Sequence, residues 1–322
     1  MLALSLALCC VLGGCAAPVQ QRHTATFLGL FDTVTTVVGR SCSEAEFRAL
    51  SRQVYDELLV YHRLFDAYHD YEGICNVKTV NDRAGIEAVA VDEAIIELLE
   101  DCRRYAELTG GKVNVAMGAV TRLWKERASP DEAALLAAAA HTDMADVLMS
   151  REGGWVYLAD SRLQLDVGAV AKGWAAQRVA QKLPENILIS VGGNVCAGGS
   201  GVAAEDAPWV VGVQNPDGAQ GEYLCRLRLR GGCVVTSGDD QRGSHIIDPD
   251  TLQPPDYWRS VTVVCGDSAL ADALSTALFL LPRSEGEALA QQCGAAVLWV
   301  GRDGEIYENA AFGRLEKEGE KA

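Results

Sequence analysis

The fold is decided by residues 209–236, which read W-V-V-G-V-Q-N-P-D-G-A-Q-G-E-Y-L-C-R-L-R-L-R-G-G-C-V-V-T. Apolar, β-favouring residues gather at 209–214, 223–230 and 233–236, and Gly, Pro and Asn separate the three runs, as is typical of strands joined by turns. No helical segment lies between them, so they are not the alternating strand and helix units of a parallel sheet. The sequence therefore predicts an α+β fold with mixed sheets rather than a doubly wound parallel sheet.

Helices and further strands are predicted on both sides of this region. Ser43 and Glu46 form a capping box at the start of a helix that ends near Phe65, and Ser129 with Glu132 forms a second one. The other helices are expected at about 92–108, 129–140, 170–183, 269–280 and 285–293, and the other strands at 26–38, 155–158, 163–166, 187–191, 261–265 and 295–300.

The composition is that of a folded protein. The chain has 322 residues, of which 49% are apolar and 22% charged, and this excludes disorder and collagen-like or coiled-coil structure. Lys and Arg number 28 against 44 Asp and Glu, which gives a net charge of −16. So acidic a chain lacks the basic surface of a general nucleic-acid binder.

The first fifteen residues are typical of a targeting segment. Residues 1–14 are apolar and end in small residues, but they are too few to span a bilayer as a helix, which needs about 20. The tetrad L-G-G-C at 12–15 resembles a bacterial lipobox, so Cys15 is predicted to carry lipid. This places the protein on the outer face of the cytoplasmic membrane or in the periplasm, held by a lipid anchor. The alternative is a buried N-terminal strand or helix.

The chain has eleven cysteines, of which Cys9, Cys10 and Cys15 belong to the targeting segment. The eight others are widely spaced, and none forms a C-x-x-C pair, so neither a zinc site nor a redox motif is expected. Their scatter is typical of buried small apolar residues, although one or two disulfide bonds remain open.

Two glycine-containing turns are candidates for contact with a phosphate. Residues 165–173 read L-D-V-G-A-V-A-K-G, in which a strand ends at Asp166 and a helix begins after the glycine. Such a turn exposes backbone N–H groups, and Lys172 could add a positive charge. Residues 190–194, S-V-G-G-N, would likewise let a ligand approach the backbone. Either segment could also be a plain tight turn.

A third segment combines T-S-G at 236–238 with H-I-I-D-P at 245–249. His245 could act as a general base near neutral pH, or it could simply be hydrogen-bonded at a strand edge. In a fourth segment Asp272 and Thr276 share one face of a predicted helix because they are four residues apart. A carboxylate and a hydroxyl are ligands that Mg²⁺ accepts. The alternative is a surface Asp beside a packed Thr.

These four segments, in this order and at these separations, resemble the ApbE family of FAD:protein FMN transferases, and the resemblance covers about residues 26–300. Phe31-Asp32-Thr33 is similar to the family's first motif, usually Met-Gly-Thr, and V-N-V-A-M-G at 113–118 with Trp124 is similar to its second. The lipobox agrees with this, since many members are lipoproteins. The family usually carries a longer segment where residues 239–244 stand here.

The resemblance implies a T-fold-like architecture with two lobes around a central flavin cleft. It divides the chain into a signal peptide at 1–15, a short linker at 16–25, a single catalytic domain at 26–312 and a charged tail at 313–322.

The resemblance also implies an activity: Mg²⁺-dependent transfer of FMN from FAD to a Thr or Ser hydroxyl of an acceptor protein, with release of AMP. The acceptor would carry a motif rich in Gly, Ser, Thr and Ala. His245 would be the base, and Asp272 and Thr276 would hold Mg²⁺ with the main-chain oxygen of Ala169. The remaining residues would form the FAD site, which comprises Phe31, Tyr68, Ala116, Met117, Gly118, Asp166, Lys172 and Ile246, with Asn194 and Thr236 in its floor.

Two alternatives remain open from the sequence. The first is a Mg²⁺-dependent FAD pyrophosphatase, in which water takes the place of the acceptor hydroxyl. The second is a flavin-binding lipoprotein without turnover.

Overall fold

The computed structural model describes residues 21–41, 43–184, 186–198, 208–219, 221–238 and 246–319. Its largest element is an eight-stranded sheet with the strand order β1-β2-β6-β7-β10-β11-β12-β13, and all of its ladders are antiparallel. The strands are β1 (Gln21–Leu30), β2 (Thr33–Ser41), β6 (Ile187–Val191), β7 (Asn194–Ala197), β10 (Cys233–Gly238), β11 (Trp258–Cys265), β12 (Ala296–Gly301) and β13 (Ile306–Glu308). The predicted α+β class is confirmed.

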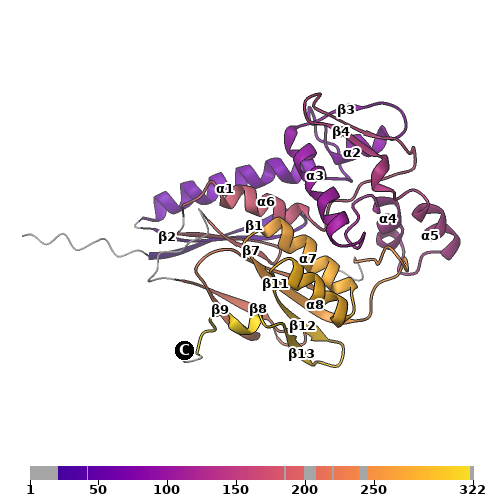
Figure 1. The fold of residues 1–322 in the computed structure, drawn as a ribbon. Coiled ribbons are helices and arrows are strands. Elements are labelled where there is room, and N and C mark those ends of the chain that lie inside the picture. Colours follow the sequence, from indigo (N-terminus) through magenta and orange to yellow (C-terminus); the bar gives the residue numbers. More distant parts are fainter. Residues whose placement is uncertain are drawn as a thin grey trace, which may run out of the picture.

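Helices cover one face of this sheet (Figure 1). They are α1 (Glu44–Phe65), α6 (Ala171–Ala180), α7 (Ser268–Leu280) and α8 (Arg283–Gln292). Helix α1 begins where the capping box predicted it, because the Ser43 side chain accepts a hydrogen bond from the Glu46 N–H. Its apolar residues Val54 and Leu58 are fully buried against α6 and the strands.

The other face of the large sheet is covered by the hairpin of β8 (Trp209–Gln214) and β9 (Tyr223–Leu229) (Figure 1). In β8 alternate side chains are buried, as the period of two in a half-buried strand requires, so Trp209 and Val211 point inward while Val210 is exposed. The inward residues pack on Val234 of β10 and Leu298 of β12.

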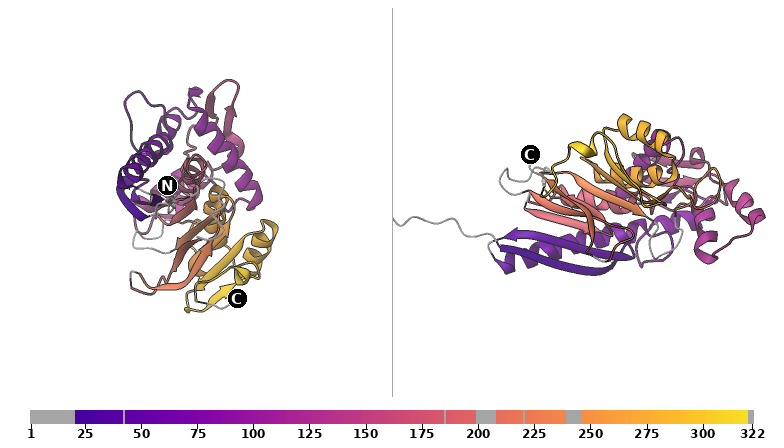
Figure 2. Two further views of the ribbon diagram at one scale, coloured as in Figure 1. Left: turned by 90° about the vertical axis from the view of Figure 1, so that its left-hand side faces the viewer. Right: turned by 90° about the horizontal axis from the view of Figure 1, so that it is seen from below.

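A second group of elements extends past one end of the large sheet (Figures 1 and 2). It contains a three-stranded sheet and four of the helices. These elements are β3 (Val89–Ala90), β5 (Trp155–Leu158), β4 (Val147–Ser150), α2 (Val77–Asp82), α3 (Glu93–Leu108), α4 (Gly118–Glu126), α5 (Glu132–Ala139) and the 3-10 helix η1 (Met144–Asp146). Asp92, which precedes α3, caps it by accepting a hydrogen bond from the Ala94 N–H.

Several boundaries differ from the prediction. Helix α5 begins at Glu132 because Asp131, rather than Ser129, accepts the capping hydrogen bond. The strand predicted at 163–166 is reduced to a single bridge between Gln164 and Met117. Strand β1 begins at Gln21, within the segment predicted as a linker.

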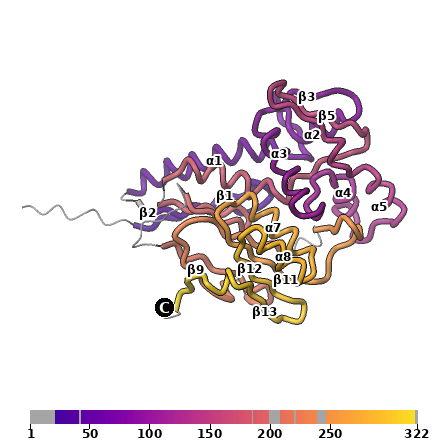
Figure 3. Tube along the Cα trace, viewed as in Figure 1, coloured from indigo at the N-terminus to yellow at the C-terminus, as the bar shows by residue number. Residues whose placement is uncertain are grey.

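Residues 313–319 of the segment predicted as a charged tail belong to the described structure. They begin within a second 3-10 helix, η2 (Phe312–Arg314), and continue beside β9 (Figure 3). Two backbone hydrogen bonds of 2.8 Å join them to this strand, from the Arg228 N–H to the Glu316 carbonyl and from the Glu318 N–H to the Arg226 carbonyl.

Within the described residues no helix combines the length and apolar character that crossing a membrane requires.

Candidate active site

Two tight turns meet at one end of the large sheet. The turn between β1 and β2 consists of Phe31 and Asp32, which have φ angles of 51° and 53°. Gly192 and Gly193, with φ angles of 57° and 93°, form the turn between β6 and β7. Positive φ at both positions is the requirement of a two-residue type I′ hairpin. A side chain at Gly192 would lie 2.6 Å from the Thr33 hydroxyl, so the two turns are in contact.

The predicted cation ligand Asp272 lies on α7 and is only 4% exposed. Its Oδ2 accepts a hydrogen bond of 2.8 Å from the Gly173 N–H at the start of α6, and the Lys172 Nζ stands 3.9 Å away. The side-chain amide of Asn194 approaches the same carboxylate without completing a hydrogen bond, so its buried Nδ2 has no partner among the described residues. Burial raises the pKa of the Asp272 carboxyl, and the neighbouring donors offset this only in part.

The carbonyl of Ala169 is available as a second oxygen ligand. In a regular helix it would accept the N–H of Gly173, four residues later. That N–H is directed to Asp272 instead, and no described residue donates a hydrogen bond to the Ala169 oxygen. The hydroxyl of Thr276 lies on the same helix as Asp272 and donates to the carbonyl of Asp272 at 3.2 Å.

These groups suit a hard divalent cation. The described residues contain no group of three or more His, Cys, Asp or Glu side chains suited to a metal. A cation here would therefore rest on one carboxylate and neutral oxygens, which is the pattern Mg²⁺ adopts when a substrate phosphate completes its coordination. The Asp272 carboxylate is buried, and the Lys172 ammonium lies as far as 3.9 Å from it. This incomplete charge compensation is the observation that favours a bound cation.

A second carboxylate, Asp166, is fully partnered. Its Oδ2 accepts from the Tyr68 hydroxyl at 2.6 Å and from Thr121 at 3.2 Å, and it forms an ion pair with the Lys125 ammonium at 3.1 Å. Its Oδ1 accepts the Gly168 N–H at 3.0 Å. Burial acting alone would raise the pKa of Asp166, but the Lys125 ammonium and these hydrogen bonds hold the pKa below its usual range.

Tyr68 and Lys125 form one unit with this carboxylate. The Lys125 Nζ lies 2.5 Å from the Tyr68 hydroxyl and 4.2 Å from the centre of its ring. Burial and the charge of Asp166 raise the pKa of Tyr68 to about 12, so its hydroxyl stays protonated and donates. Tyr68 is 37% exposed, and the Arg122 guanidinium also lies over its ring, 5.9 Å from the ring centre. The sequence did not predict a role for Lys125, because this residue lies 57 residues from Tyr68 and 41 from Asp166 in the chain.

The second predicted motif supports the turn that carries Asp166. Met117 and Ala116 are buried, and Gly118 begins α4. The Gly118 N–H donates to the Gln164 carbonyl at 2.9 Å, and a Cβ at this glycine would lie 2.5 Å from that oxygen. Only glycine allows this close approach of backbones.

Phe31 is held by a hydrogen bond that the sequence did not reveal. Its N–H donates to the Nδ1 of His62 on α1 at 3.1 Å. The Nε2 of His62 faces the Tyr71 hydroxyl at 3.4 Å, and that hydroxyl donates to Asp66 at 2.8 Å. Burial lowers the pKa of His62, which favours the neutral ring that the Phe31 N–H requires.

The structure does not bring the side chain of Thr236 into this group. Thr236 bonds to the Thr262 hydroxyl at 2.9 Å, whereas its neighbour Ser237 contacts Ser275 of α7 at 2.7 Å. Successive side chains of a strand point to opposite faces, so Ser237 is the residue that faces α7 and Asp272. Ile246 packs at the edge of the main core. His245 and Cys15 lie outside the described residues.

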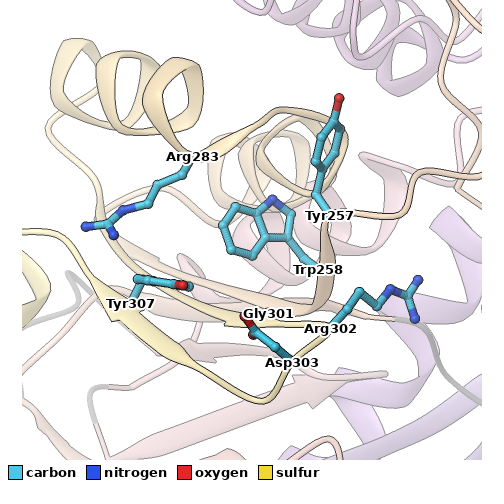
Figure 4. A pocket seen from close by; sticks show the side chains of 7 residues that line it. All are labelled: Tyr257, Trp258, Arg283, Gly301, Arg302, Asp303 and Tyr307. Carbon is cyan, nitrogen blue, oxygen red and sulfur yellow. The ribbon is translucent and has the colours of Figure 1, made fainter.

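A shallow depression of about 350 Å³ is formed by residues outside this set (Figure 4). Trp258 lies in the middle of the group, and the guanidinium of Arg283 stands 4.5 Å from the centre of the Tyr307 ring. None of the predicted site residues lines it.

The fold and the site together define the class: an α+β enzyme in which Asp166 lies at the start of the turn into α6 and Asp272 of α7 accepts a hydrogen bond from Gly173 in the first turn of that helix. The profile of the ApbE family matches residues 31–299, and the chain belongs to this family.

Relatives of known name agree. A protein named FAD:protein FMN transferase from Treponema pallidum is 30% identical, over 94% of this chain and 91% of its own length. One of the same name from Klebsiella pneumoniae is 27% identical, over 94% of this chain and 93% of its own. Among solved structures, the ApbE protein of Thermotoga maritima matches with a TM-score of 0.80 and 27% identity, covering 92% of this chain and all of that one. The flavin transferase ApbE of Vibrio cholerae, 23% identical with a TM-score of 0.77, shows the same fold.

Proposed function

We propose that this protein transfers FMN from FAD to a Thr or Ser hydroxyl of an acceptor protein, releases AMP and depends on Mg²⁺. The observation that carries the proposal is the buried carboxylate of Asp272, whose pKa is raised by burial, together with the carbonyl of Ala169, to which no described residue donates. The names of the relatives support the flavin chemistry.

Asp272, Thr276 and the carbonyl of Ala169 would hold the ion. When bound, Mg²⁺ would neutralise charge on the pyrophosphate, which phosphoryl transfer needs more than covalent help from the enzyme. Within the chain, the Gly173 N–H fixes the orientation of the Asp272 carboxylate. Lys172, 3.9 Å from that carboxylate, places a positive charge at the same point.

The flavin would lie against the group of Tyr68, Lys125 and Asp166. The exposed part of Tyr68 would contact the flavin, and its hydroxyl is held by Asp166 at 2.6 Å. The strand-to-helix turn from Asp166 to Gly173 connects this group with Asp272, so a dinucleotide could reach both. His245, which immediately precedes Ile246 in the chain, would take the proton of the acceptor hydroxyl.

The acceptor would be a protein with a motif rich in Gly, Ser, Thr and Ala. We also propose that Cys15 carries the lipid that anchors the enzyme to the outer face of the cytoplasmic membrane, because the tetrad at 12–15 has the lipobox pattern. Labelling with a radioactive fatty acid would test this, and a Cys15→Ser variant that still incorporates label would contradict it.

One assay tests the activity. The protein is incubated with FAD, Mg²⁺ and an acceptor peptide, and the products are identified by mass spectrometry. We expect flavin on the peptide and free AMP. FMN and AMP without labelled peptide would instead indicate a pyrophosphatase, and intact FAD would indicate a binding protein.

Two variants assign the roles. Asp272→Asn should abolish the stimulation by Mg²⁺, and His245→Ala should abolish transfer while FAD still binds. Asp56→Asn, an exposed carboxylate on α1, is the matched control and should transfer at the wild-type rate. Transfer by Asp272→Asn that still rises with Mg²⁺ would rule out the ligand assignment.

A further inference from the structure

Three cysteines lie side by side on neighbouring strands of the large sheet. Cys233 of β10 is the register partner of Cys196 on β7 and of Cys265 on β11. Residues directly opposite each other in an antiparallel pair point to the same face, so the three thiols share one face. Cys196 and Cys233 pack there against α6 residues such as Val179, which identifies it as the face that the helices cover.

The central thiol is in contact with both neighbours. The Cys233 Sγ donates to the carbonyl of Cys265 at 3.2 Å, and the neighbouring thiols of Cys196 and Cys265, together with burial, raise the pKa of Cys233. All three are free thiols. Directly paired residues of antiparallel strands have Cα atoms about 4.5 or 5.5 Å apart. Both separations fall within the range of about 4.4–6.8 Å that a disulfide bond accepts, so the backbone need not move.

Exposure distinguishes the three thiols. Cys233 is fully buried and Cys196 is 3% exposed, whereas Cys265 is only half-buried. A reagent in solution therefore reaches Cys265 first. The neighbouring Cys233 thiol and the backbone of Asp267 lower the pKa of Cys265 against the effect of burial. The thiolate is the form that attacks a disulfide.

We propose that Cys265 and Cys233 form a redox-active dithiol, which thiol–disulfide exchange with an external disulfide converts into a bond between β10 and β11. The thiolate of Cys265 attacks the external disulfide, forms a mixed disulfide and releases one thiolate. The Cys233 sulfur then attacks the Cys265 sulfur, the second external thiolate leaves, and the proton of Cys233 passes to it. Two protein thiols are oxidised and one external disulfide is reduced to two thiols.

This dithiol is separate from the proposed active site. Ser237, which faces Asp272 and its helix, lies four residues further along β10, about 13 Å at the rise of a strand. The bond would join Cys233 and Cys265, which are 32 residues apart in the chain. Cys233 lies at the end of β10 opposite to the end that is near the two tight turns. The proposal therefore does not depend on flavin transfer.

The sequence makes the test direct. Cys233 is the only cysteine in the tryptic fragment 231–242, and Cys265 is the only one in the fragment 260–283. The full-length protein is incubated with glutathione disulfide, free thiols are blocked, and the tryptic fragments are identified without reduction. We expect the fragments 231–242 and 260–283 to be joined, and dithiothreitol to separate them. Their recovery as unlinked fragments would overturn the proposal, as would a bond from either cysteine to Cys196 or Cys293.

Variants test the order of the steps. Cys233→Ala should keep a stable glutathione adduct on Cys265, because the second thiol is missing. Cys265→Ala should leave Cys233 unmodified, and an adduct on Cys233 in this variant would contradict the proposed order. Cys75→Ala removes an exposed cysteine outside the group and should form the bond as the wild type does. If a core variant fails to fold, the wild-type mapping decides by itself.

Discussion

Replacement of Gly173 by alanine should separate the two helices that carry the candidate cation site. A Cβ at this position would lie 2.2 Å from the carbonyl oxygen of Ser268 and 2.6 Å from the Cβ of Asp272. Both neighbours belong to α7, and one of them is backbone, so neither can give way alone. To restore ordinary contact, α6 and α7 must move apart by about 1 Å, which stretches the Gly173 N–H bond to Asp272 beyond hydrogen-bond range.

The magnitude follows from three effects. Overpacking of a tight contact costs about 1–3 kcal/mol. Loss of a hydrogen bond to a charged group costs about 1.5–3 kcal/mol. Alanine in place of glycine within a helix returns about 1 kcal/mol. We therefore expect a loss of about 3 kcal/mol in the free energy of unfolding, or a melting temperature lower by roughly 5 °C.

Thermal and urea unfolding of the full chain would measure this loss. Gly266→Ala is the matched control, since a Cβ there meets no atom within 4 Å, and it should melt close to the wild type. Gly173→Ala should also need more Mg²⁺ for half-maximal transfer. A melting temperature within about 2 °C of the Gly266→Ala protein would refute the packing argument.

Three further predictions concern single side chains. Burial lowers the pKa of His62 from 6.5, so the folded state favours the neutral ring. The stability that this provides is present above pH 6.5 and is lost as the pH falls. The drop in melting temperature between about pH 7.5 and 5.5 should therefore be smaller in His62→Gln than in the wild type. Lys125→Met should raise the pKa of Asp166, because burial then acts without the ammonium; an NMR titration of the carboxyl that shows no upward shift would disprove this. Ser237→Ala should slow transfer more than Thr236→Val does, because Ser237 is the residue that faces α7. The main effect of Thr236→Val should be a stability loss of about 1 kcal/mol. If Thr236→Val is the slower variant when rates are compared at equal folded fraction, Ser237 does not face the site.

Local signals predicted most of the elements correctly. The capping box of Ser43 and Glu46 marked the start of α1, and the three β-rich runs from 209 to 236 became β8, β9 and β10. Helix α5 was predicted three residues early because Ser129 and Asp131 are both good caps, and the choice between them depends on the surrounding loop.

The site was less accessible from the sequence. Asp166 and Lys172 lie on the turn into α6 and in its first turn, and Asp272 of α7 contacts the same segment through Lys172 and Gly173. Lys125 was missed, since nothing local distinguishes it from any exposed lysine until folding brings Asp166 to it. The resemblance pointed to Thr236, whereas Ser237 is the residue whose side chain faces α7, because which of two neighbouring strand residues faces a helix depends on the packing of the sheet.

The segment that lies beside β9 has a consequence for the solubility of the protein. An exposed strand edge offers unpaired N–H and carbonyl groups to any other chain, and this is a common route to aggregation. Residues 316–318 occupy these groups on β9, and the ion pair of Glu316 with Arg228, at 2.6 Å, adds charge to the edge. Residues 316–318 thus cover part of this edge, and a chain truncated before Leu315 should precipitate more readily even where its catalytic parts are intact.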